Sequence, residues 1–138
     1  MFEQIREGTA FMRQALQGFS MRQQALSQNL SNADTPNYKR MEVGFEAQLA
    51  QKANLTERSP MVTTDDRHFP FPSDPIGFSP VVSVDKGSTL RRDGNNVDVD
   101  QEMSRLSQNE IGYNAATQFL SGRFAMLKYV IADGGSGG

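Results

Sequence analysis

The sequence predicts a mainly α-helical fold with two long terminal helices that pair as an antiparallel coiled coil. A short irregular or β-containing segment is expected between them. Three observations support this: apolar residues recur with heptad spacing at both ends, the middle is rich in proline, and helix stop and start signals flank that middle. The expected parts are a helix over 1–33, a turn and extended segment over 34–97, a helix over 98–133 and a disordered Gly/Ser tail over 134–138.

The first helix carries apolar residues at alternating spacings of three and four positions. This spacing places them on one stripe, which is typical of a helix that packs against another helix. Gly8 and Gly18 each cost such a helix about 1 kcal/mol relative to alanine, so we expect it to need a partner for full order. The packing residues expected on the stripe are Ile5, Met12, Leu16, Phe19, Leu26 and Leu30.

A turn motif is expected to end the first helix. Pro36 has no amide hydrogen and pushes Thr35 out of the α region, so the helix must end before it. Pro36 and Asn37 suit the central positions of a type II turn, in which Asn37 takes a positive φ. The residues expected to set the angle at which the chain leaves the helix are Asn32, Thr35, Pro36, Asn37 and Tyr38.

The middle segment, residues 39–97, shows no persistent heptad. Four of the six prolines crowd into FPFPSDPIGFSP, so this stretch is expected to be extended or looped. Val81–Val84 and Thr89–Arg92 flank a loop ending in Gly87, which is consistent with a short hairpin.

The second long helix is expected to begin after Asp98, a good N-cap with Gln101 three residues later. Asp100 and Glu102 in the first turn favour the same start, because acidic groups there meet the positive end of the helix dipole. Gly134 is expected to end the helix. The packing residues expected on its stripe are Met103, Leu106, Tyr113, Leu120, Phe124, Leu127 and Ile131.

Pairing two such helices once leaves further apolar residues off both stripes. Two helices of about 30 residues would each be about 45 Å long. Either the middle segment covers the remaining apolar surface, or helices of neighbouring subunits do. The residues in question are Phe11, Met21, Ile111, Phe119, Met126 and Val130.

Composition and charge argue against several classes of protein. The net charge of -2, with scattered Lys and Arg, leaves no basic surplus for nucleic acid. Without cysteine there is no disulfide framework and no zinc site of the sulfur-rich kind. The N-terminal sequence has no cleavable signal pattern, and no apolar run reaches the roughly 18 residues that span a bilayer.

Two places could have carried chemistry, and neither pattern is complete. His68, the single histidine, stands near Asp65 and Asp66, but nothing supplies an oxyanion hole or a nucleophile elbow. The acidic run 93–102 has Asp98 where a calcium-binding EF-hand loop needs glycine, so a helix cap explains these acids better. We therefore expect no catalytic residue, no cofactor and no metal.

Two sequence blocks resemble a known family. The stretch NLSNADTPNY, residues 29–38, is similar to the motif that ends the N-terminal helix in the bacterial flagellar axial proteins, the family of rod, hook and hook-associated proteins. The stretch DGNNVDVDQEM, residues 93–103, looks like the start of the C-terminal helix in the small proximal rod proteins. The resemblance covers about 40 residues at each end, and Asn37 stands where the family usually has glycine. Asparagine also tolerates the left-handed conformation.

The resemblance implies a structural subunit of the flagellar basal-body rod. Such a subunit would pass through the flagellar type III export system without a cleaved signal and assemble in the periplasmic space by helix packing. Its implied partners are copies of itself, other proximal rod proteins, the membrane-embedded basal-body ring and the export gate. A cytoplasmic coiled-coil adaptor or export chaperone is the alternative, and a hydrolase using His68 is a remote third.

Overall fold

A computed structural model of the chain describes residues 2–57, 78–87 and 91–134. The described part is mainly helical with a small two-stranded sheet, which confirms the predicted class at that level. The proline-rich stretch up to residue 77, His68 and tail residues 135–138 lie outside the described residues. The elements are α1 (Phe2–Ser31), β1 (Met41–Gly44), α2 (Glu46–Glu57), β2 (Val81–Val84) and α3 (Val99–Gly134).

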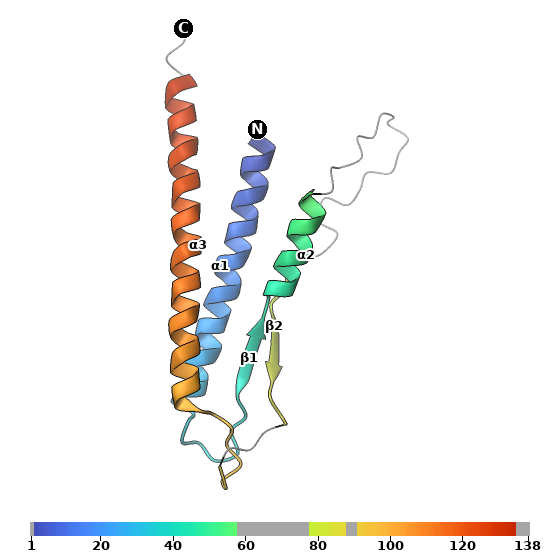
Figure 1. Cartoon of the computed structure of the whole chain (residues 1–138), viewed down its shortest axis with the longest axis vertical. Coiled ribbons are helices and arrows are strands. Elements are labelled where there is room, and N and C mark those ends of the chain that lie inside the picture. Colours follow the sequence, from blue (N-terminus) through green and yellow to red (C-terminus); the bar gives the residue numbers. More distant parts are fainter. Residues whose placement is uncertain (1, 58–77, 88–90, 135–138) are drawn as a thin grey trace, which may run out of the picture.

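The two long helices α1 and α3 lie side by side and run in opposite directions (Figure 1). With 36 residues against 30, α3 is the longer, and its C-terminal end extends past the start of α1 (Figure 1). No helix in the described ranges is both long and apolar enough to cross a membrane.

The sheet is not the hairpin predicted from the sequence. Strand β2 forms at the predicted residues, but it pairs antiparallel with β1, with Met41 opposite Val84 and Gly44 opposite Val81. Beyond the strand ends, the Asp85 N–H donates to the Arg40 carbonyl at 2.9 Å. The partner expected after the loop is wrong: residues 91–92 lie in a bend and turn, and 88–90 are outside the described ranges.

Helix α2 was not predicted, because residues 39–97 were expected to be extended or looped. Its sequence, EAQLAQKANLTE, contains strong helix formers but few apolar residues, so no stripe reveals it. One side chain, Leu49, joins the core. The intrinsic helix propensity of its residues accounts for this helix, whereas apolar periodicity does not reveal it.

The apolar core is small and lies between α1, β1 and α2. Its fully buried centre is Phe45, whose ring stands edge-on to Phe19 with centroids 5.0 Å apart. Gly18 makes room for that ring, since a Cβ there would lie 2.4 Å from it. The buried members are Ala15, Ala25, Val43, Phe45 and Leu49.

The face that α3 turns toward α1 differs from the predicted stripe. Phe19 of α1 packs on Gly112, where a Cβ would lie 2.6 Å from the ring, and Asn109 and Ala116 are buried on the same side. Small residues there let the helix backbones approach closely, so the contact lies one position away from the apolar stripe. The expectation that one pairing buries both stripes is therefore wrong for four residues that remain exposed, Met103, Tyr113, Phe124 and Ile131.

The other predicted packing residues have varied positions. Leu26 is buried, and Ile5 lies in the first turns of α1. The remainder are half-buried: Met12, Leu16, Phe19, Leu30, Leu106, Leu120 and Leu127.

Candidate functional site: a polar junction, an exposed helical face and a groove

The two sequence blocks singled out above meet in space at one end of the helix pair. We call this region the motif junction and define it as residues 29–41 together with residues 91–105. The chain leaves α1 and enters α3 here, at the end opposite the start of α1 and the end of α3 (Figure 1). Polar side chains and backbone groups connect the two stretches.

The turn after α1 has the predicted geometry. Asn37 has a φ of 60°, the left-handed value expected for it. The Tyr38 N–H donates to the Thr35 carbonyl at 3.3 Å, which closes the turn across Pro36. The Asn37 N–H donates to the Asp93 carbonyl at 2.9 Å, so this turn is also bonded to the second block.

Asn95 caps the end of α1 from the second block. Its side chain is fully buried, and its Nδ2 donates to the carbonyls of Asn32, Ala33 and Thr35 at 3.0, 3.0 and 2.9 Å. Its Oδ1 accepts the Val97 N–H at 2.7 Å. Carbonyls at the end of a helix lack partners within the helix, and Asn95 supplies partners for those beyond α1.

Asn96 connects the same block to the sheet. Its Oδ1 accepts the Arg40 N–H at 2.7 Å, and its Nδ2 donates to the Asp85 carbonyl at 2.9 Å. The preceding Gly94 has a φ of 80°, and a Cβ there would lie 2.6 Å from the Asn37 Oδ1. Adjacent asparagines thus connect the end of α1 and the end of the sheet.

Asn29 joins α1 to the strand edge. Its Nδ2 donates to the Met41 carbonyl and its Oδ1 accepts the Met41 N–H, both at 2.8 Å, as a neighbouring strand would. The Tyr38 hydroxyl donates to the same Oδ1 at 3.1 Å. The Nδ2 also donates to Glu102 at 2.8 Å, which connects the strand edge to α3.

Glu102 is a fully buried carboxylate in the first turn of α3. Its Oε1 lies 3.3 Å from the Arg40 guanidinium and 3.4 Å from that of Arg105, while Asn29 donates to Oε2. A buried charge needs such partners, because removing one of them exposes the full desolvation cost. Burial, and then the Glu102 charge, raise the pKa of the Tyr38 hydroxyl above its usual 10.0.

The predicted cap Asp98 begins α3 next to this cluster. Its Oδ1 accepts the Gln101 N–H at 3.1 Å, and its carbonyl accepts the Glu102 N–H at 2.9 Å. The cap therefore fixes the position of Glu102. Within the described ranges, no group of three or more His, Cys, Asp or Glu side chains is placed to hold a metal ion.

The second feature is an apolar face on α3. Ile111, Phe119 and Met126 are 70%, 67% and 64% exposed, and their positions fall on one side of the helix. Exposed apolar surface of this extent is typical of an interaction surface. The exposed large apolar residues of α3 are Val99, Met103, Ile111, Tyr113, Phe119, Phe124, Met126, Tyr129, Val130 and Ile131.

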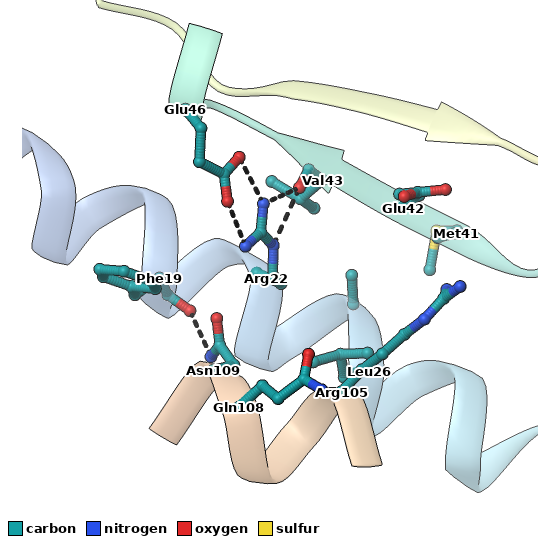
Figure 2. A pocket seen from close by; sticks show the side chains of 11 residues that line it. Phe19, Arg22, Leu26, Met41, Glu42, Val43, Glu46, Arg105, Gln108 and Asn109 are labelled. Carbon is teal, nitrogen blue, oxygen red and sulfur yellow. Dashed lines mark hydrogen bonds and ion pairs between the residues drawn. The ribbon is translucent and has the colours of Figure 1, made fainter. Parts of the chain in front are cut away.

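The third feature is a groove of about 410 Å³ between α1, β1 and α3 (Figure 2). Arg22 donates to the Val43 carbonyl at 2.8 and 3.0 Å and to Glu46 at 2.7 Å, and its guanidinium lies 4.6 Å from the centre of the Phe45 ring. Burial alone would raise the pKa of Glu46. The hydrogen bond from Arg22, backbone N–H groups and the Arg22 charge together lower that pKa below its usual 4.5.

The structure brings the predicted turn residues and Asp98 into one region, but the sequence did not predict what connects them. Asn29, Asn95 and Glu102 make the connecting contacts, and their partners lie 12 to 73 positions away. Asparagine recurs in both blocks, and this recurrence is the visible sequence signal for the contacts between them. A single sequence does not say which carbonyl each amide meets.

Comparison with known proteins finds relatives along most of the chain. A flagellar basal body rod protein FlgB of Bacillus subtilis strain 168 is 38% identical over 120 residues, which cover 87% of this chain and 89% of the relative. The proteins of the same description from Borrelia hermsii and Escherichia coli K12 are 36% and 26% identical and cover 81% and 97% of this chain. The matches span 86% and 99% of those relatives. A scan against protein-family models finds no match.

Proposed function

The chain belongs to the FlgB family of flagellar basal body rod proteins, and from this premise we propose that it is a proximal-rod subunit that packs through its long helices on neighbouring subunits. The observation that carries the proposal is the exposed apolar face of α3. Ile111, Phe119 and Met126 are each more than 60% exposed in the single chain. Helices of neighbouring rod subunits would remove this surface from water.

The pairing of α1 and α3 as an antiparallel coiled coil is part of the proposal. Their opposite directions and the packing of Phe19 on Gly112 support it. The contact uses one side of α3 and leaves its apolar stripes to other helices. A subunit that binds different neighbours through different faces makes heterologous contacts, which extend as a helical filament when they do not close.

The proposed route and location follow the family. The chain would be exported by the flagellar type III system without a cleaved signal and would join the rod in the periplasmic space. There it would contact copies of itself, other proximal rod proteins, the membrane-embedded ring and the export gate. The role is structural, so the proposal assigns no catalytic activity and no cofactor.

A matched pair of variants tests the assembly face. Phe119→Ser with Met126→Ser removes two exposed apolar side chains from α3. Gln118→Ser with Ala125→Ser changes two exposed residues at the same spacing, one position earlier. We expect the first pair to abolish swimming and to remove the chain from purified basal bodies, measured by mass spectrometry. The second pair should leave both unchanged.

The monomer's helical circular dichroism should survive in both double variants, because these side chains make little contact within the chain. Normal incorporation of the Phe119/Met126 variant into basal bodies would refute the assembly face. If the unmodified chain forms a discrete cytosolic oligomer and is absent from basal bodies, the adaptor or chaperone role is correct instead.

A further inference from the structure

We propose that strand β2 pairs edge to edge with β2 of a second copy of the chain. The two copies then share one continuous antiparallel sheet, in which the two β2 strands lie at the centre. In this contact Val82 of each copy lies opposite Val84 of the other, and the two Ser83 residues face each other across a two-fold axis. The contact goes beyond the proposed function, because it concerns the free chain and not the rod.

The outer edge of β2 is the open edge of the sheet. Strand β1 lies between α1 and β2, and β2 has β1 as its neighbour on one side only (Figure 1). The other edge of β1 is occupied, because the Asn29 side chain bonds both the N–H and the carbonyl of Met41, each at 2.8 Å. Within the described residues, a further strand can therefore join the sheet only at β2.

The backbone of β2 directs the polar groups of two residues toward that edge. In an antiparallel ladder, the N–H and carbonyl of alternate residues point toward the paired strand, and those of the residues between them point away. The Asp85 N–H donates to the Arg40 carbonyl, so the groups of Val82 and Val84 point away from β1. Within the described part of the chain, these groups have no hydrogen-bond partner.

This edge is complementary to itself, which selects the occupant. When a second β2 runs antiparallel with its Ser83 opposite the first, the Val82 N–H of one copy meets the Val84 carbonyl of the other. The Val84 N–H likewise meets the Val82 carbonyl, and the two-fold axis repeats both bonds. Every outward donor and acceptor of the strand is then paired.

The ends of the edge favour this register. Pro80 precedes the strand and has no N–H to donate. After the strand, the Gly87 N–H donates to the Asp85 side chain at 3.0 Å, so the chain turns away there. A slip by one residue would place outward groups opposite inward ones. The register centred on Ser83 therefore pairs the most groups.

The side chains of β2 also suit a second copy. Val81, Val82 and Val84 are 56%, 51% and 46% exposed, and the strand carries no charge. Charged residues, lysine above all, normally protect an open edge from pairing with another chain. In the proposed register Val82 of each copy packs beside Val84 of the other on one face of the sheet, and no like charges lie opposite each other.

The two-fold axis makes this dimer an alternative to the rod. Strand β2 runs roughly along the axis of the helix pair (Figure 1), so antiparallel pairing places the helix pairs of the two copies in opposite directions. A contact that uses the same surface on both copies closes at a dimer and does not extend. The dimer must therefore separate before its subunits join a polar filament.

Cross-linking of the purified chain tests the contact, because the chain has no cysteine of its own. The two Ser83 residues would form a non-hydrogen-bonded pair with Cα atoms about 4.5 Å apart, which suits a disulfide. We expect Ser83→Cys to form a disulfide-linked dimer under mild oxidation. In the control Val81→Cys the two cysteines would lie about 13 Å apart, so its dimer should form at least tenfold more slowly.

The backbone bonds are tested by adding Val82→Pro to Ser83→Cys. This change removes the outward N–H of Val82 and no bond to β1, and proline is tolerated where the N–H of an edge strand faces solvent. We expect the dimer to form on the order of tenfold more slowly, because half of the hydrogen bonds between the copies are lost. Val82→Thr keeps the N–H and the branched shape, and it should change the rate by less than about twofold. Helical circular dichroism should be the same in both.

The outcomes separate this inference from the proposed function. Equal dimer rates for Ser83→Cys and Val81→Cys, equal rates for the proline and threonine variants, or a Ser83→Cys chain that stays monomeric would overturn the β2 contact. The last result would mean that another segment or another protein occupies the edge. None of these results affects the rod role. If Ser83→Cys dimerises as expected but the wild-type chain is absent from basal bodies, the proposed function fails and the β2 contact stands.

Discussion

At the scale of single residues, buried amides connect parts of the chain that lie far apart in sequence. Asn95 and Asn29 are both fully buried, and each makes hydrogen bonds to backbone groups of another segment. An amide has both donors and an acceptor, so it can bond to the edge of a strand or the end of a helix equally well. This is why asparagine recurs in both sequence blocks.

Asn95→Ala should lower the free energy of unfolding by about 2–4 kcal/mol, because it removes three hydrogen bonds to the carbonyls of residues 32, 33 and 35 and leaves the buried Val97 N–H without its acceptor. Asn114→Ala, an exposed asparagine of α3, is the control and should change the free energy by less than about 0.5 kcal/mol. Urea unfolding followed by circular dichroism measures both. Equal values for the two variants would show that the Asn95 bonds do not stabilise the junction.

Local geometry at this scale was predictable, but long-range partners were not. The positive φ of Asn37 and the cap at Asp98 follow from residue type and immediate neighbours. The partners of Asn95 lie about 60 positions back along the chain. No local rule selects them, because amide hydrogen bonding is equally satisfied by many carbonyls.

At the scale of elements, helical glycines determine how the helices pack. Gly18 holds the Phe45 ring and Gly112 holds the Phe19 ring, so each glycine that weakens its own helix admits an aromatic side chain. The closeness of these contacts explains why α3 faces α1 with small residues. From the sequence alone, Gly18 is only a cost to its helix, because the Phe45 ring that packs on it comes from another part of the chain.

Gly18→Ala should destabilise the protein by about 1–3 kcal/mol, because the new methyl would lie 2.4 Å from the Phe45 ring. Gly122→Ala in α3 is the matched control, since nothing lies within 4 Å of its Cβ position. Helix propensity predicts that this change stabilises by up to about 1 kcal/mol. Thermal unfolding of the two variants should shift in opposite directions, and shifts of the same sign would contradict the role of Gly18.

The element pattern also shows where periodicity misleads. The apolar stripe of α3 was assigned to pairing with α1, yet residues such as Met103 and Phe124 are exposed. Periodicity identifies an apolar side of a helix but not its partner. Strand β2 was located correctly, and its partner was wrong for the same reason.

At the scale of the whole molecule, order should fall from the junction toward the other end. The junction bonds lie at one end of the helix pair and the core cluster packs against the middle of α1, while the last turns of α3 extend past α1 (Figure 1). Segments with few buried contacts open at lower free energy. In dilute monomer we expect the outer halves of both helices to be partly unfolded and to order on assembly.

Hydrogen exchange of dilute monomer measures this gradient. Amides of Ala25–Asn29 and Asn109–Ala116 should be protected, and those of Phe124–Ile131 should exchange at least a hundredfold faster. Assembled rods should protect both. Uniform protection in the monomer, with a fully helical circular dichroism signal and one sharp melt, would contradict the expected ordering on assembly.

The placement of the two chain ends has a mechanical consequence. Because α1 begins and α3 ends at the same end of the molecule, a pull between them loads one helical turn of the contact at a time (Figure 1). The contacts between α1 and α3 then separate one after another from that end, and they do not share the load as they would in shear. The hydrogen bonds of the buried asparagines and Glu102 at the far end break last. A partly unfolded chain therefore keeps the motif junction, from which the two helices can pair again.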